Sequence, residues 1–254
     1  MAVQLEGGCR VAGMREGIPA HHGTLRTWTQ IGRATGTRAI SLRIIECAPG
    51  LSPAWSNQDC DEVLYIVEGR ATIHLDGASR QVSPETGIYL PPLASIAVEN
   101  PGPHGVLLAS SRCPDPGGPA DESIPGMAAR VDAAARGAAG VVALSEREAV
   151  PTSDRWYRVL VDEKVGSARV TQFVGSIPPG RAPDHFHHYE EVLLVLAGSG
   201  VMWAGKSHTP IGSGSCIYLP HGQVHCVENT GNGELRLLGV FYPAGSPAVS
   251  YTAG

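Results

Sequence analysis

The chain has 254 residues, enough for one large domain or two small ones with real hydrophobic cores. Charged residues make up 17% of it and the formal net charge is −5, without a basic stripe, so we do not expect nucleic acid as a partner. The first residues, MAVQLEGGCRVAGMREG, lack the apolar centre of a signal peptide, and no stretch reaches the length of a membrane span. We therefore expect a cytoplasmic protein with no membrane partner.

From Thr24 to about residue 111, short apolar runs alternate with turns. The runs are AISLRIIECAPG, EVLYIVEG, ATIHLDG, GIYLPP, SIAVENPG and HGVLLAS. Runs of four to eight residues rich in Val, Ile, Leu and Tyr and closed by Gly, Pro or Asn are typical of strands. Their spacing predicts an antiparallel sandwich or barrel. We expect an all-β N-terminal domain over residues 1–111.

Residues 112–140 interrupt this rhythm. The segment CPDPGGPADESIPG is rich in Pro and Gly and poor in apolar residues, as linkers are. The segment MAARVDAAARGAAG follows; because it is Ala-rich and free of Pro, it predicts one short helix that ends at Gly137 or Gly140. The strand rhythm then resumes, which predicts a second domain over residues 141–254.

The second domain repeats the first at a constant offset of 129 residues. EVLYIVEG at 62–69 matches EVLLVLAG at 191–198, IYLP at 88–91 matches IYLP at 217–220, and VEN at 98–100 matches VEN at 227–229. A single register held over roughly eighty residues is typical of an internal repeat. The sequence therefore predicts two copies of one fold.

Four potential metal ligands gather in the second copy. His185, His187 and Glu191 stand at spacings of two and four residues, and His225 follows about thirty residues later. Because side chains alternate faces along a strand, His185 and His187 point the same way, and His225 approaches from another strand. Three imidazoles and a carboxylate suit one divalent transition metal, and the spacing does not choose among Fe, Mn, Ni, Co and Zn. The ligands must be deprotonated, so we expect binding to weaken below about pH 6.

These residues resemble the two sequence motifs of the cupin superfamily. The first motif, G-x4-H-x-H-x3-E-x6-G, with a first spacer one residue shorter than the commonest form, is met by Gly180, His185, His187, Glu191 and Gly198. The second motif, G-x5-P-x-G-x2-H-x3-N, is met by Gly214, Pro220, Gly222, His225 and Asn229. The resemblance implies two cupin-type β-barrels (double-stranded β-helices, or jelly rolls) in tandem, with the metal inside the second. Because some two-barrel cupins dimerise, it also makes a homodimer an expectation.

At the same offset, the four ligands fall on residues that do not form a metal site. The correspondences are His185 with Ser56, His187 with Gln58, Glu191 with Glu62 and His225 with Ile96. The turn glycines and prolines remain. We therefore expect the first copy to keep the fold and to lack the metal, as a structural domain or, alternatively, as a metal-free ligand pocket.

Four ligands on a six-coordinate metal leave two positions for water, substrate or dioxygen. The resemblance implies dioxygenase chemistry on a small organic substrate as the first expectation. The alternative is Lewis-acid chemistry, as in cupin isomerases, lyases and hydrolases. Among these, ureidoglycine aminohydrolase is similar in its two-barrel architecture but has a different ligand pattern. A non-catalytic small-molecule-binding cupin is a third interpretation.

Most of these mechanisms need a general acid or base near the metal. Arg169 and Gln172 precede the first motif, and Tyr218 lies near the second. We take Gln172 and Tyr218 as the candidate catalytic residues. The remaining strand residues are mostly apolar, which favours a small, weakly charged or aromatic substrate.

Overall fold

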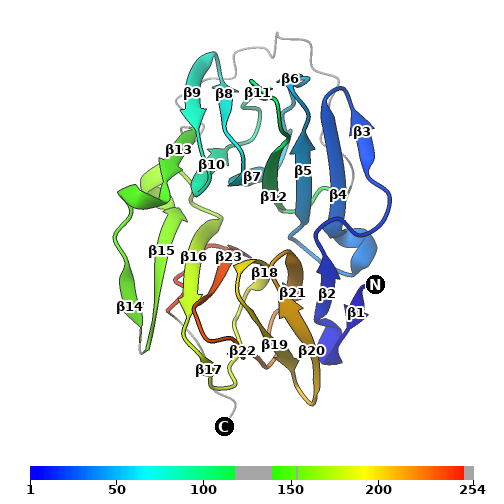
Figure 1. Cartoon of the computed structure of the whole chain (residues 1–254), viewed down its shortest axis with the longest axis vertical. Helices are drawn as coiled ribbons and strands as arrows, with labels where there is room; N and C mark the ends of the chain where they lie inside the picture. The colour runs from blue at the N-terminus through cyan, green and yellow to red at the C-terminus, as the bar shows by residue number, and fades with distance from the viewer. Residues whose placement is uncertain (118–138, 153, 249–254) are drawn as a thin grey trace.

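The computed structural model describes residues 1–117, 139–152 and 154–248, and short antiparallel strands make up most of them. Single 3-10 turns interrupt the strands at Glu6–Gly8, Arg33–Thr35, Leu144–Glu146 and Glu163–Val165. The predicted all-β fold of two barrels is confirmed, and Figure 1 shows one barrel above the other. The short helix predicted within 112–140 falls outside the described ranges, apart from its last two positions. Within those ranges, no helix is long and apolar enough to cross a membrane.

The N-terminal barrel is built from a seven-stranded and a four-stranded sheet, both antiparallel. The larger sheet contains, in spatial order, β13 (Gly140–Ala143), β10 (Thr86–Leu90), β7 (Asp61–Glu68), β12 (Val106–Cys113), β5 (Leu42–Cys47), β4 (Leu25–Ile31) and β3 (Ala20–His22). The smaller sheet contains β6 (Gly50–Leu51), β11 (Ile96–Asn100), β8 (Ala71–Leu75) and β9 (Ala78–Val82). The apolar runs of the sequence form these strands, and glycine closes β7 because Gly69 has a φ of 86°, which other residues rarely adopt.

The C-terminal barrel repeats this arrangement with an eight-stranded and a four-stranded sheet. The larger sheet contains β1 (Val3–Gln4), β2 (Arg10–Gly13), β21 (Ser215–Leu219), β18 (Glu190–Ala197), β23 (Leu235–Tyr242), β16 (Thr171–Ile177), β15 (Arg155–Val161) and β14 (Val150–Thr152). The smaller sheet contains β17 (Gly180–Arg181), β22 (His225–Asn229), β19 (Ser199–Ala204) and β20 (Ser207–Gly212).

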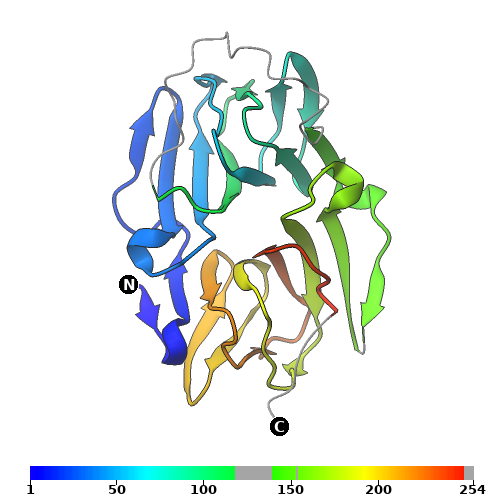
Figure 2. The same cartoon turned by 180° about the vertical axis from the view of Figure 1, so that it is seen from behind.

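Each barrel takes strands from the other half of the chain. The N-terminal strand β2 pairs with β21, where Val11 lies opposite Ile217. In return, β13 pairs with β10, where Val141 lies opposite Ile88. Figures 1 and 2 show the first strands beside the lower barrel and β13 beside the upper one. The sheets therefore cross the domain boundaries expected at residues 111 and 141, and β12 itself continues to Cys113.

Three hydrophobic clusters follow from strand alternation. One fills the N-terminal barrel, one fills the C-terminal barrel, and the third lies between the two larger sheets. Along β18, Leu193 and Val195 belong to the interior of the C-terminal barrel, whereas Val192 and Leu194 belong to the cluster between the barrels. Successive side chains of a strand point to opposite faces, so one apolar run supplies both clusters.

Buried carboxylates at the start of β7 and β18 link the barrels. Glu190 accepts hydrogen bonds from the backbone N–H groups of Arg38 at 3.0 Å and Ala39 at 2.7 Å. At the equivalent place in the first copy, Asp61 accepts a hydrogen bond of 2.7 Å from the guanidinium of Arg169. Each carboxylate therefore contacts a segment of the opposite barrel, which fixes the relative position of the two larger sheets.

Candidate metal centre

Three histidines of the C-terminal barrel converge in the structure. His185, His187 and His225 each offer one ring nitrogen, and these nitrogens lie within 4.8 Å of one another. The ring centroids of His185 and His225 are 4.5 Å apart, and those of His185 and His187 are 4.9 Å apart. The strand alternation used to predict the cluster therefore places the three imidazoles around one point.

The backbone fixes two of these imidazoles. His185 and His225 form an isolated antiparallel bridge, with N–H···O distances of 3.0 and 2.8 Å in the two directions. The Nδ1 atom of His185 lies 2.9 Å from the carbonyl oxygen of Pro183, and that of His225 lies 2.8 Å from the carbonyl oxygen of Gln223. A carbonyl can only accept, so Nδ1 carries the proton and Nε2 keeps the lone pair that a metal needs.

Glu191 lies beside the triad in the same cavity. Its Oε2 atom is 3.9 Å from Nε2 of His187, and the side chain is buried. It stands outside the compact group of three nitrogens. The structure thus brings all four predicted ligands to one cavity and places Glu191 at its margin.

Burial sets the protonation of His185, His225 and Glu191. It lowers the pKa of His225 to about 3, with smaller contributions from His185 and His187, and it lowers the pKa of His185 as well. Burial raises the pKa of Glu191 to about 8. The two histidines are therefore neutral near pH 7, as ligands must be. Glu191 is protonated near pH 7 in the metal-free protein, so metal binding there must displace its proton.

These residues fit a divalent transition metal. Imidazole nitrogens with one carboxylate are its common donor set. The buried carboxylate of Glu191 is costly in its charged form, and a cation beside it offsets that cost. The donor set does not select one metal among Fe, Mn, Ni and Zn.

A cavity of about 340 Å³ opens onto the four residues. Its walls are mainly aromatic and aliphatic, and the aromatic side chains are Trp156, Tyr157, Phe173 and Tyr189. Tyr189 stacks between His187 and Phe241, at centroid distances of 4.7 and 4.2 Å. The sequence motifs did not single out Trp156, Tyr157 or Tyr189, because aromatic residues in strands are usually core.

The two candidate catalytic residues lie outside this cavity. Gln172 donates a hydrogen bond from Nε2 to the backbone carbonyl of Leu64 in the other barrel, at 3.3 Å. The hydroxyl of Tyr218 donates to Glu190, and burial together with that carboxylate raises the pKa of Tyr218, so it stays protonated. Both side chains alternate out of the barrel, toward the cluster between the sheets. The geometry therefore gives neither a role in proton transfer at the histidines.

A scan against family models matches residues 173–241 to the cupin domain. These residues run from the cavity wall at Phe173 to the end of the strand that pairs with β18, and they contain all four predicted ligands. This match decides the family of the second barrel. The C-terminal barrel is a cupin domain.

Solved structures similar to this cupin share its fold over nearly the whole chain. The protein YlbA from E. coli is 12% identical with a TM-score of 0.76, and the alignment covers 95% of this chain and 93% of that one. A deletion mutant of the oxalate decarboxylase OxdC from Bacillus subtilis is 15% identical with a TM-score of 0.71, and covers 92% and 76% of the two chains. At these identities the likeness concerns the fold.

Curated relatives match shorter segments. Auxin-binding protein 1 from Arabidopsis thaliana is 34% identical over 83 residues, which are 29% of this chain and 42% of the relative. An oxalate-binding protein from Thermotoga maritima is 36% identical over 66 residues, which are 25% of this chain and 54% of the relative. This cupin thus spans about half the length of the curated relatives it matches.

The first cupin barrel places different residues at the metal position than the constant offset suggests. The bridge between His185 and His225 has its equivalent in a bridge between Trp55 and Ile96. The N–H of Gly222 bonds to the carbonyl of His187, and that of Leu93 bonds in the same way to Asn57. Trp55 and Asn57, not Ser56 and Gln58, therefore replace the two histidines. The offset is 130 residues before this point and 129 after it, because the first copy has one additional residue between Asn57 and Glu62.

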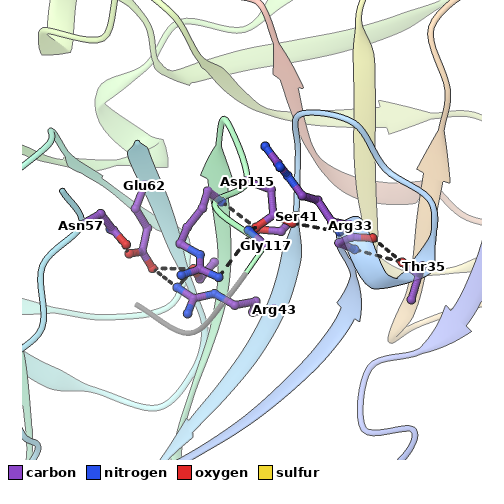
Figure 3. Close-up of polar contacts among 11 residues, drawn as sticks. Arg33, Thr35, Ser41, Arg43, Asn57, Glu62, Asp115 and Gly117 are labelled. Atoms are coloured by element: carbon purple, nitrogen blue, oxygen red, sulfur yellow. Dashed lines mark hydrogen bonds and ion pairs between the residues drawn. The ribbon is translucent and has the colours of Figure 1, made fainter. Parts of the chain in front are cut away.

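An arginine takes the place of the metal charge in the first barrel. The buried Glu62 accepts hydrogen bonds from Arg43 Nη2 and Ser110 Oγ, both at 2.5 Å, from Asn57 Nδ2 at 2.7 Å and from Trp55 Nε1 at 3.2 Å. Figure 3 shows Arg43 and Asn57 meeting at Glu62. The strand pairings place Arg43 where the second barrel has Phe173. The sequence-based comparison of the two copies did not consider Arg43. Its positive charge explains why Glu62 remains buried there without a metal.

Proposed function

We propose that this bicupin is a metal-dependent enzyme that acts on a small organic molecule, with dioxygen chemistry as the first expected reaction. The observation that carries the proposal is the triad of His185, His187 and His225 with Glu191 at the end of a cavity of about 340 Å³. A divalent metal bound there supplies a Lewis acid, and a redox-active one also supplies a site for dioxygen. The fold neighbour OxdC is by name an oxalate decarboxylase, and oxalate is a small organic acid.

The residues of this chain would each have a defined task. The three imidazoles and Glu191 hold the metal. Phe173 and Tyr157 form apolar walls that exclude bulk water and orient a flat or aliphatic substrate. Nε2 of His225 stays unprotonated near neutral pH, because burial lowers the pKa of this side chain to about 3. The centre is therefore prepared for a metal and for a substrate with adjacent oxygen donors.

The test combines metal analysis with an oxygen-uptake screen. The protein is purified anaerobically, its metal content is measured, and samples loaded with iron, manganese, nickel or zinc are given enolic, phenolic and carboxylic substrates in the presence of dioxygen. His225→Ala is the test variant, and His208→Ala is the control, because His208 stacks on Trp203 outside the cavity. We expect one metal per chain and oxygen uptake in the native protein and the control, and neither in His225→Ala.

The outcomes separate the alternatives. Turnover without oxygen consumption, with any metal, favours the Lewis-acid isomerase, lyase or hydrolase. Full metal occupancy in His225→Ala contradicts the site itself.

A non-catalytic binding protein is the second candidate. The names of two relatives, an auxin-binding and an oxalate-binding protein, favour it. Its sign is tight ligand binding without turnover, retained after Glu191→Ala.

A further inference from the structure

One cationic side chain lines the metal cavity. Arg155 begins β15 and lies opposite Thr152 of β14, and both residues line the cavity together with His185 and His187. Among the described residues around the cavity, Arg155 is the only arginine or lysine.

The guanidinium of Arg155 is only partly engaged. Its Nε donates a hydrogen bond of 2.9 Å to Asp154, and the side chain is 24% exposed. The two terminal nitrogens have no hydrogen-bond partner among the described residues. A guanidinium held at Nε still presents Nη1 and Nη2 as a pair of parallel donors, which is the geometry that a carboxylate accepts.

The charges of the cavity favour an anion. A divalent metal with three neutral imidazoles and one carboxylate retains one net positive charge, and Arg155 adds a second. The partner of Arg155, Asp154, is 59% exposed and does not line the cavity. The walls of the same cavity include the rings of Trp156, Tyr157 and Phe173. An anionic substrate with an apolar or aromatic body matches this arrangement.

We propose that Arg155 is the specificity-determining residue that binds a substrate carboxylate, so that the substrates of this site are small aromatic or apolar carboxylates that also carry oxygen donors for the metal. This inference deepens the proposed function and rests on it for the metal. It differs from the expectation of a weakly charged substrate, which rested on the apolar strand residues alone, and it keeps the expectation of an aromatic or apolar body.

The test measures binding rather than turnover. The zinc-loaded protein, whose metal content is measured first, is titrated calorimetrically with benzohydroxamate and with its ring-substituted carboxylate and carboxamide. The hydroxamate supplies two adjacent oxygens for the metal in all three probes, so only the distal group differs. Arg155→Gln removes the charge and keeps a polar side chain. Arg158→Gln is the matched control on the same strand, because Arg158 packs over Trp156 and bonds to the carbonyl of Leu144 outside the cavity.

We expect the native protein and Arg158→Gln to bind the carboxylate about tenfold more tightly than the carboxamide, as for a hydrogen bond between charged groups. Arg155→Gln should bind both equally and should bind benzohydroxamate as the native protein does. Equal affinities in the native protein, or a preference retained in Arg155→Gln, would overturn the role of Arg155 and leave the metal centre standing. Failure of the native protein to hold zinc or benzohydroxamate would overturn both proposals, whereas absence of turnover alone concerns only the proposed function.

Discussion

Replacing Arg43 by methionine tests whether the arginine has taken over the electrostatic role of a metal in the first barrel. The change keeps most of the side-chain volume and removes the counter-ion of Glu62, which is 0% exposed. Removing one partner of a buried ion pair costs about 3–5 kcal/mol. We expect the lower end, about 3 kcal/mol, because Ser110, Asn57 and Trp55 still donate to the carboxylate. Chemical denaturation at pH 7, followed by near-UV circular dichroism, measures the loss.

The pH dependence of that loss gives the sharper test. In the native protein, burial alone would raise the pKa of Glu62, but the charge of Arg43 and the hydrogen bonds from Ser110 and Asn57 hold it below its usual value. The stabilisation by this group is therefore present above the unfolded pKa of about 4.3 and is lost as the pH falls through the folded pKa. In Arg43→Met, burial dominates and the folded pKa rises above the unfolded one. In this variant, the stabilisation by protonated Glu62 is complete below the unfolded pKa and is lost as the pH rises through the folded pKa.

The difference in unfolding free energy between the native protein and Arg43→Met should therefore widen from pH 5 toward pH 8, by up to about 1.4 kcal/mol per pH unit. The double variant Arg43→Met/Glu62→Gln removes both charges of this pair and leaves the buried Arg112 to its ion pair with Asp115, so it should lose this pH dependence and recover part of the stability. A difference that stays constant with pH, or one below about 1 kcal/mol at pH 7, would refute the role assigned to Arg43.

Three further predictions concern the other barrel and the sheets. Burial raises the pKa of Glu191 to about 8. The metal affinity of the native protein, measured against a chromophoric chelator, should therefore fall about tenfold per pH unit below that value, whereas the affinity of Glu191→Gln should stay constant from pH 6 to 8. A constant affinity in the native protein would show that Glu191 is not a ligand. Tyr218→Phe should leave the metal content unchanged and lower the free energy of unfolding in denaturant by about 1–2 kcal/mol, because the buried Glu190 loses a hydrogen-bond donor. A loss of bound metal would instead indicate that Tyr218 contributes to the metal site. Residues 141–254 expressed alone should aggregate, because this fragment exposes both the unpaired edge of β21 and the apolar face of its larger sheet; a soluble monomeric fragment would contradict these contacts.

The repeat and the cluster of three histidines could be predicted because they depend on local pattern. Apolar runs closed by glycine become strands whatever their partners, and the even spacing of His185 and His187 fixes a common face. The sequence could not place Tyr218 and Gln172 relative to the histidines, because it does not give the pairing register of their strands. The structure pairs Glu191 with Leu219, so Leu219 shares the face of the ligand and Tyr218 has the opposite one.

The sequence also could not show contacts made by unrelated segments. Arg155 belongs to no motif, and only the β14–β15 hairpin brings it to the cavity of the histidines. Arg43 likewise precedes Glu62 by 19 residues and meets it only when β5 and β7 both pair with β12. The first copy has one additional residue before Glu62, which shifts by one the alignment of everything that precedes it. The segments that revealed the repeat all follow this residue, so their constant offset did not show the shift.

The pairing of β2 with β21 has a consequence for how the chain is made. Val11 is synthesised about two hundred residues before its partner Ile217. At about 5–20 residues per second, the first strand waits on the order of 10–40 s for its neighbour. The N-terminal barrel likewise lacks β13 until translation has passed Ala143. Neither barrel can therefore be completed in the order in which it is synthesised. The C-terminal barrel closes only when β2, which was made much earlier, is still free to pair with β21.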